Sequence, residues 1–154
     1  GSEMCIRDRN ITMKQFAKGV YDLKNPQKYA GKKAPFYRSS WELTFMRMCD
    51  THPNVLTWDS EPVRIPYKHP FTGKVTVYVP DFLVVYVDKQ GKKNGELVEI
   101  KPRSQTMLEA VKSKRDKAHL AVNGAKWKAC AAWCKKKGLN FRVLNEDNIY
   151  QMKS

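Results

Sequence analysis

Three charged residues accompany two apolar runs, residues 82–87 and 97–100: Asp81 precedes the first run, Glu99 lies inside the second and Lys101 directly follows it. Because side chains alternate between the two faces of a strand, Glu99 and Lys101 point to one face, away from their apolar neighbours. A hairpin joining the two runs brings Asp81 beside Glu99. The sequence therefore predicts two carboxylates and a lysine at one edge of a sheet.

Two carboxylates held together repel each other, and burial makes their ionisation more costly still. A divalent cation relieves both effects, and oxygen ligands of this kind suit Mg²⁺, with Mn²⁺ expected to substitute. Lys101 cannot bind a cation while protonated, but it can stabilise phosphate charge or help to orient and deprotonate a water molecule. The three residues together are typical of metal-dependent phosphodiester hydrolysis.

Structural roles are open for each of these residues. Asp81 follows Pro80 and could cap a turn, while Glu99 and Lys101 could form a surface ion pair that contributes little to stability. The apolar neighbours of Glu99 favour a buried strand instead. Glu61 is a further acid near this region in the sequence, and we expect it at the edge of a strand.

The charge of the chain predicts an anionic partner. Its 154 residues include 29 Lys and Arg against 15 Asp and Glu, a formal net charge of +14, which favours nucleic acid over an anionic membrane. No run approaches the roughly 18 apolar residues that a membrane span needs, and the N-terminus lacks an apolar signal region. We expect no membrane partner and no secretion.

The remaining elements follow from periodicity and turn composition. Ser39 and Glu42 match a capping box that opens a helix with Trp41, Phe45 and Met48 on one face. Strands are predicted over residues 55–58, 63–67, 75–79, 82–87, 97–100 and 141–144, and helices over 107–122 and 125–137. This order predicts an α/β sandwich with a mixed sheet.

The chain divides into three segments. Residues 1–9 resemble a cleaved tag followed by adapter-derived sequence and are predicted to be non-native. Residues 10–38 are predicted to form an extended basic arm. Residues 39–154 are predicted to form one domain with a single core.

Residues 101–137 carry eleven Lys and Arg against Glu109 and Asp116. A basic run is usually a solvated helix face, but this one follows the candidate site directly, and we interpret part of it as a phosphate-binding surface. Trp127 and Trp133 are expected in the core, and no base-reading helix is evident, which predicts little sequence specificity. The candidate DNA contacts are Arg38, Arg103, Lys112, Lys114, Arg115 and Lys117.

The residues Pro80-Asp81 and Glu99-Ile100-Lys101 resemble the signature of the PD-(D/E)xK nuclease superfamily. The helix start that contains Glu42 is similar to the first core helix of TnsA and its relatives. The resemblance implies a restriction-endonuclease-like αβββαβ core with a mixed central sheet flanked by helices. It implies catalytic roles for Glu42, Asp81, Glu99 and Lys101, with Mg²⁺ held by the three acids and by the Ile100 carbonyl.

Four further segments, residues 25–29, 37–43, 58–61 and 65–67, are similar to the head-completion (neck) proteins of contractile-tailed bacteriophages. This resemblance covers residues 24–101 best. It implies a DNA endonuclease acting on duplex or branched DNA in the host cytoplasm during phage assembly, or in the virion head or neck. Portal and neck proteins are the implied protein partners. The resemblance leaves open whether the chain forms a homo-oligomer.

Two alternatives to a head-completion nuclease are considered. The first is a structural neck protein that binds DNA and portal without relevant catalysis, and the intact set of three acids and a lysine argues against it. The second is a transposition or repair nuclease of the TnsA type.

Overall fold

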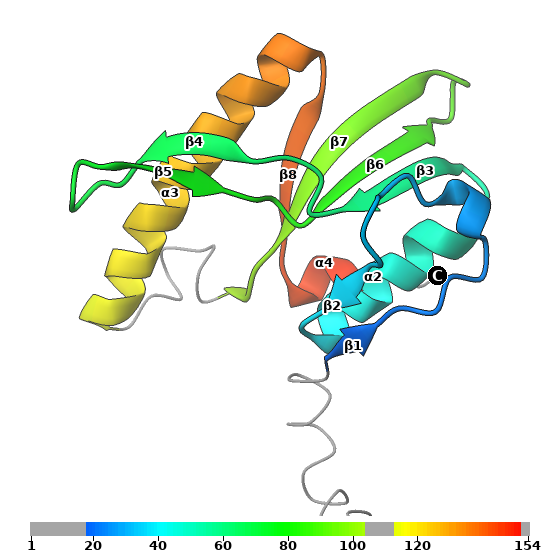
Figure 1. Cartoon of the computed structure of the whole chain (residues 1–154), viewed down its shortest axis with the longest axis horizontal. Coiled ribbons are helices and arrows are strands. Elements are labelled where there is room, and N and C mark those ends of the chain that lie inside the picture. Colours follow the sequence, from blue (N-terminus) through cyan, green and yellow to red (C-terminus); the bar gives the residue numbers. More distant parts are fainter. Residues whose placement is uncertain (1–17, 104–112, 152–154) are drawn as a thin grey trace, which may run out of the picture.

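The computed structural model describes residues 18–103 and 113–151, with the side chains of residues 149–151 excepted (Figure 1). The predictions for residues 1–9, for Lys112 and for a helix beginning at residue 107 lie outside this part. Within it, no helix combines the length and the apolar character that crossing a membrane requires.

The centre of the fold is a four-stranded sheet in the order β3-β6-β7-β8. β3, β6 and β7 pair antiparallel, whereas β8 pairs parallel to β7. One helix, α2, precedes the sheet, and α3 links β7 to β8, so the predicted αβββαβ core is confirmed. The bounds are α2 (Ser40–Thr51), β3 (Val55–Ser60), β6 (Phe82–Val87), β7 (Lys93–Ile100), α3 (Lys114–Lys137) and β8 (Asn140–Leu144).

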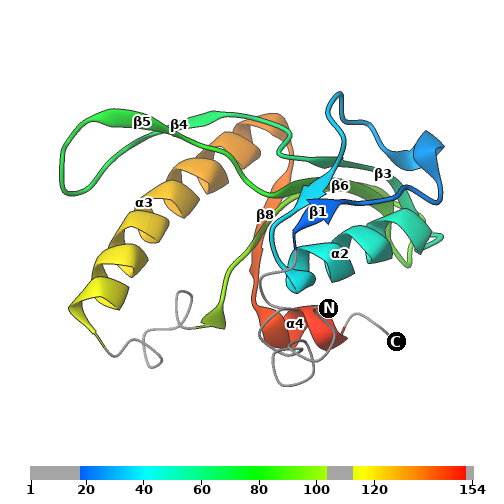
Figure 2. The ribbon, with the colours of Figure 1, turned by 60° about the horizontal axis from the view of Figure 1, so that its bottom comes forward.

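A separate hairpin is inserted between β3 and β6 and lies along α3 (Figures 1 and 2). Its strands are β4 (Ile65–Lys68) and β5 (Val75–Tyr78). They pair antiparallel across the turn that the sequence predicts. The hairpin leads directly into Asp81 and so connects the outer layer of the molecule to the candidate site.

The sheet separates two hydrophobic clusters. Val98 and Ile100 of β7 belong to the cluster that includes Phe45 of α2, whereas Leu97 belongs to the cluster under α3 and the hairpin. This alternation follows from the pleat of a strand. It places Glu99 on the α3 side of the sheet, opposite to Val98 and Ile100, and this alternation is as the sequence predicts.

The N-terminal arm contains β1 (Gly19–Val20), the 3₁₀ turn η1 (Pro26–Lys28) and β2 (Phe36–Tyr37). It is fixed to the end of α2 by Asp50, which is fully buried. The Asp50 carboxylate accepts hydrogen bonds from the Tyr21 hydroxyl (2.7 Å) and from the backbone N–H groups of Lys24 (2.7 Å) and Asn25 (3.0 Å). Such bonds to a buried charged acceptor hold the arm in one position.

The prediction of two helices separated at Asn123-Gly124 is wrong, because α3 runs without interruption to Lys137. A glycine inside a helix costs only about 1 kcal/mol, and the packing of α3 on β4 and β8 offsets this. The helix ends where predicted, at Gly138, whose φ of 73° is the left-handed conformation of a helix C-cap.

Two other elements differ from the prediction. β7 begins at Lys93 rather than Leu97, because residues 93–95 pair with the end of β6 although their composition is that of a turn. The short helix α4 (Glu146–Gln151) after β8 was not predicted. Figure 2 shows α4 below β8, on the side of the sheet where α2 lies.

Candidate active site

Asp81 and Glu99 face each other at the edge of the β6–β7 pair. Phe82 pairs with Val98 in this antiparallel ladder. Asp81, which precedes Phe82, therefore lies opposite Glu99, which follows Val98. Asp81 Oδ2 accepts a hydrogen bond of 2.8 Å from the backbone N–H of Ile100. Asp81 therefore binds the neighbouring strand rather than capping its own turn, and the predicted proximity of the two carboxylates is confirmed.

Glu99 is a buried acid beside Lys101 and Tyr78. Its side chain is 5% exposed, and Oε2 lies 3.5 Å from Nζ of Lys101, whose side chain is 27% exposed. Its other oxygen, Oε1, is buried and makes no hydrogen bond within 3.5 Å among the described residues, while the Tyr78 hydroxyl is near enough to Glu99 for a weak hydrogen bond that raises the pKa of Tyr78. Glu99 and Lys101 therefore do form an ion pair, but Glu99 is buried rather than part of an exposed strand.

Burial raises the pKa of Asp81 well above its ordinary value, and the negative charges of Glu99 and Glu42 raise it further. The Ile100 N–H and Lys101 oppose this increase. The pKa of Glu42 is also raised by burial, with hydrogen bonds and Arg38 acting against it and Glu99 adding to it. The three predicted acids are thus electrostatic neighbours, a common mark of a functional site.

Glu42 takes part in the predicted capping box. Its backbone N–H donates to Ser39 Oγ (3.1 Å), and its carboxylate accepts from that hydroxyl (3.2 Å) and from the Arg38 N–H (3.3 Å). In this conformation, no group of three or more His, Cys, Asp or Glu side chains in the described ranges is arranged to hold a metal ion. The structure therefore brings the carboxyl groups of Asp81 and Glu99 together, with Glu42 nearby.

The donor set of this pair fits a small divalent cation. Burial and the negative charges of Glu99 and Glu42 make ionisation of Asp81 costly, and a bound cation would remove this cost. Mg²⁺ is commonly bound by one or two carboxylates and completes its octahedron with water. Glu42 and the Ile100 carbonyl remain predicted additional ligands.

An arginine and a strained glutamate border the two acids. Arg38 Nη1 lies 2.6 Å from Glu61 Oε1, and the charge of Arg38 also acts on Glu42 and Asp81. Glu61 follows the end of β3, has a positive φ of 51° and donates its backbone N–H to the Asp81 carbonyl (2.8 Å). A positive φ at a residue other than glycine costs about 1–2 kcal/mol and is often found at functional sites.

The predicted DNA contacts fall into two groups. Arg38 lies beside the acids, whereas Lys114, Arg115 and Lys117 are exposed in the first turn of α3. Arg103 donates its backbone N–H to Glu146 Oε1 (2.8 Å). The expectation that both tryptophans of α3 belong to the core is confirmed, because they pack against the cluster under the hairpin.

The structure adds two residues that the sequence analysis did not select, Tyr78 and Lys126. Tyr78 ends β5, and its hydroxyl is buried and makes no hydrogen bond within 3.5 Å in the described part of the chain. Burial raises the pKa of Tyr78, and the charge of Glu99 and a weak hydrogen bond to its carboxylate raise it further. Period-two alternation could have placed Tyr78 on the inner face of the hairpin, but no sequence signal distinguishes Lys126 from the other lysines of α3.

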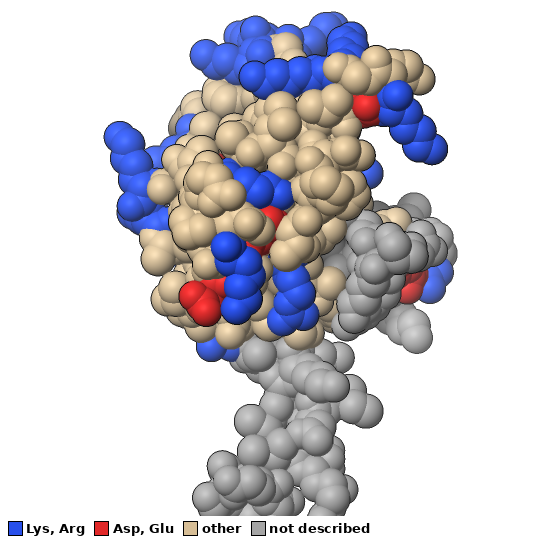
Figure 3. All heavy atoms as spheres, turned by 90° about the vertical axis from the view of Figure 1, so that its right-hand side faces the viewer, with Lys and Arg blue, Asp and Glu red and all other residues tan. Residues whose placement is uncertain are grey.

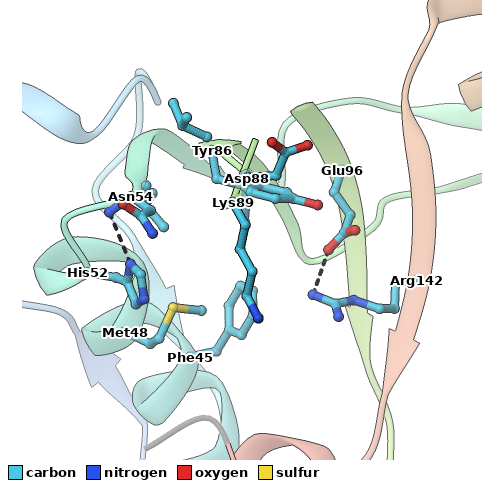
Figure 4. A pocket seen from close by; sticks show the side chains of 12 residues that line it. Phe45, Met48, His52, Asn54, Tyr86, Asp88, Lys89, Glu96 and Arg142 are labelled. Carbon is cyan, nitrogen blue, oxygen red and sulfur yellow. Dashed lines mark hydrogen bonds and ion pairs between the residues drawn. The ribbon is translucent and has the colours of Figure 1, made fainter. Parts of the chain in front are cut away.

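A pocket of about 320 Å³ lies elsewhere, between the end of α2, the far end of β6 and the start of β8 (Figure 4). Its lining includes Met48, Tyr86 and an ion pair between Glu96 and Arg142 (2.7 Å). None of the four candidate catalytic residues lines it. The pocket is therefore separate from the candidate active site.

Basic side chains also gather far from the acids. Figure 3 shows Lys and Arg concentrated at the end of the molecule where Figure 1 places the β6–β7 turn and the C-terminal end of α3. The lysines of the turn and those of α3 are far apart in the sequence, and only the fold brings them to the same end of the molecule. The exposed residues at this end are Lys89, Lys92, Lys93, Lys135, Lys136 and Lys137.

An αβββαβ core with two acids and a lysine at the sheet edge defines a nuclease of the restriction-endonuclease-like class. Residues 52–146 match the family described as TnsA-like endonuclease N terminal. The chain is also 34% identical over 142 residues to the head completion nuclease of Enterobacteria phage T4, an alignment that covers 85% of this chain and 92% of that protein. The chain belongs to the TnsA-like endonuclease family. Its matched range includes Asp81, Glu99 and Lys101, whereas Glu42 precedes it.

Proposed function

We propose that this protein is a Mg²⁺-dependent DNA endonuclease of low sequence specificity that acts in the completion of a phage head. The observation that carries the proposal is the Asp81–Glu99 pair at the edge of the sheet, with Lys101 adjacent. The assignment to head completion rests on the relative from phage T4, whose length the alignment covers almost fully.

Each residue has a defined task in this proposal. Asp81 and Glu99 hold the cation, with Glu42 and the Ile100 carbonyl as further ligands. A bound divalent cation supplies Lewis acidity toward a phosphoryl oxygen and lowers the pKa of water. Lys101 stabilises the charge that develops on the phosphate or orients the attacking water.

The N-terminal end of α3 supports a DNA-binding surface. Lys114, Arg115 and Lys117 lie in the first turn, where the helix dipole disfavours positive charge. A phosphate near this turn would be attracted both by the three cations and by the free N–H groups of the helix end. Together with Arg38 beside the acids, these residues can contact the backbone of one DNA molecule.

The proposal predicts nicking of plasmid DNA only in the presence of a divalent cation. Purified protein should convert supercoiled plasmid to open-circle and linear forms with Mg²⁺ or Mn²⁺, and excess EDTA should stop the reaction. Adding the cation back after EDTA should restore it. Full activity of metal-stripped protein in EDTA would contradict the metal-dependent mechanism, and no cleavage with any divalent cation would contradict nuclease function.

DNA binding should depend strongly on salt and little on sequence. Each phosphate contact contributes a slope of about −0.9 to a plot of log K against log salt for duplex DNA. Replacing Lys114, Arg115 and Lys117 together by glutamine should make this slope less steep, by up to the contribution of about three phosphate contacts. Fluorescence anisotropy in EDTA measures the slope for both proteins. An unchanged slope would remove this turn from the interface, and strong preference for one sequence in competition would contradict nonspecific binding.

A purely structural role in the phage neck is less well supported. A buried carboxylate beside a partly buried one destabilises a protein that does not use them, and a structural protein has no need of this arrangement. A role in transposition or repair rests on the family match alone. The relative matched over 92% of its length favours head completion over that role.

A further inference from the structure

Lys126 occupies an unusual position for a lysine. It lies in the middle of α3, is partly buried, and its ammonium lies 5.9 Å from the ring centres of both Tyr67 and Tyr78. No acid forms an ion pair with it in the part of the chain that the structure describes. Lys128, two residues further along the helix, is exposed.

The surroundings of Lys126 connect it with the acids. Burial lowers the pKa of Lys126, and the positive charge of Lys101 lowers it further, while the negative charge of Glu99 acts in the opposite direction. Tyr78, beneath the ammonium, is itself a neighbour of Glu99. Lys126 is thus an electrostatic neighbour of Glu99 and Lys101, but it belongs to the helix α3 that covers this face of the sheet rather than to the sheet itself.

We propose that Lys126 binds the phosphate undergoing cleavage, together with Lys101, so that α3 contributes directly to the catalytic centre. This inference rests on the proposed nuclease function. A phosphodiester carries one negative charge and gains a second as the attacking oxygen bonds to phosphorus. Two ammonium groups that repel each other in the free protein are both stabilised by this charge, more in the transition state than in the ground state.

The position of Lys126 explains why it is available for a phosphate. A partly buried cation without an acid partner is incompletely compensated, because a cation–π contact contributes only about 0.5–2 kcal/mol. The rings of Tyr67 and Tyr78 hold the stem in place but offer no ion pair. A purely structural alternative exists, in which the stem of Lys126 covers the two rings and its charge has no function.

Three variants separate the two roles. Lys126→Met keeps the apolar stem and removes the charge, Lys126→Arg keeps the charge, and Lys128→Met removes an exposed lysine about 200° around the helix. Because the methionine retains contact with both rings and removes a partly buried charge, we expect Lys126→Met to fold. Single-turnover cleavage at saturating DNA, DNA affinity in EDTA and thermal melting are measured for all three and for the wild type.

We expect Lys126→Met to lower the single-turnover rate by about 10- to 100-fold, with DNA affinity within about threefold and an unchanged melting temperature. Lys126→Arg should recover most of the rate, and Lys128→Met should cleave like the wild type. Wild-type cleavage by Lys126→Met overturns the inference. So does equal loss of rate and of melting temperature in Lys126→Met and Lys126→Arg, which would indicate packing. An inactive wild type would instead reject the proposed function itself, and this inference with it.

Discussion

The variant Asp81→Ala is expected to lose DNA cleavage by about 10³- to 10⁴-fold or more while it remains folded and binds DNA. Asp81 is one of two adjacent carboxylates that would hold the cation, and its backbone-bonded oxygen fixes the distance between β6 and the end of β7. Removal of one carboxylate leaves the cation with too little negative charge. Plasmid nicking with Mg²⁺ and Mn²⁺ measures the loss.

The fold of the Asp81 variants can be tested separately. Alanine leaves the Ile100 N–H without its acceptor, which costs about 1–3 kcal/mol if no water replaces it, while the repulsion from Glu99 disappears. Asparagine keeps an acceptor and removes only the charge, so Asp81→Asn should melt at or above the wild-type temperature in EDTA and still fail to cleave DNA. Wild-type nicking by either variant would remove Asp81 from the catalytic centre.

Asp59→Asn provides a matched control for Asp81. Asp59 is another partly buried carboxylate, on the neighbouring strand β3, and burial raises its pKa as well. Its neighbour is Tyr29 rather than Glu99. We therefore expect Asp59→Asn to cleave like the wild type, and an equal loss in both variants would indicate a general effect of charge on the fold.

The variant Lys101→Ala is expected to lower the single-turnover rate by about 10²- to 10³-fold and to keep its affinity for the cation. The ammonium lies 3.5 Å from Glu99 Oε2 but has no lone pair for a metal while it is protonated. Its removal takes away charge stabilisation that matters most in the transition state. It also removes the ion-pair partner of Glu99, which should strengthen metal binding slightly.

Calorimetric titration with Mn²⁺ and single-turnover cleavage on the same preparation separate the two effects of Lys101→Ala. Lys93→Ala, at the exposed start of the same strand, serves as the control and should behave like the wild type. Normal cleavage by Lys101→Ala would show that Lys101 is not needed for the chemistry. Loss of Mn²⁺ binding by a folded Lys101→Ala protein would show that Lys101 positions the ligands instead.

The strand pairing at the site could be predicted because it is local. Asp81 and Glu99 lie on neighbouring strands joined by a short turn, and alternation alone sets which face Glu99 and Lys101 share. The cap at Ser39 was likewise predicted from four residues and is confirmed at 3.1 Å. Local hydrogen bonds and strand periodicity leave clear patterns in a sequence.

Contacts between distant segments left no such pattern. The approach of Glu42 to Asp81 depends on how α2 packs on the sheet, and the Arg38–Glu61 pair on how the arm and β3 meet. Lys126 is one of many lysines in a helix, and only tertiary packing places it over two tyrosines of the hairpin. The break predicted at Asn123-Gly124 failed for the same reason, because packing overrides a weak local preference.

The parallel pairing of β7 with β8 imposes an order on folding. The β6–β7 hairpin, which brings the two acids together, needs only neighbouring residues and can form early, whereas β8 returns after the whole of α3. The backbone N–H of Lys101 donates to the Leu144 carbonyl at the end of β8 (2.9 Å). The two acids can therefore come together before β8 docks, but the backbone of Lys101 is fixed only when this last strand is in place. A nascent or truncated chain would carry paired carboxylates and an open edge on β7, and would gain catalytic competence only with its C-terminal segment in place.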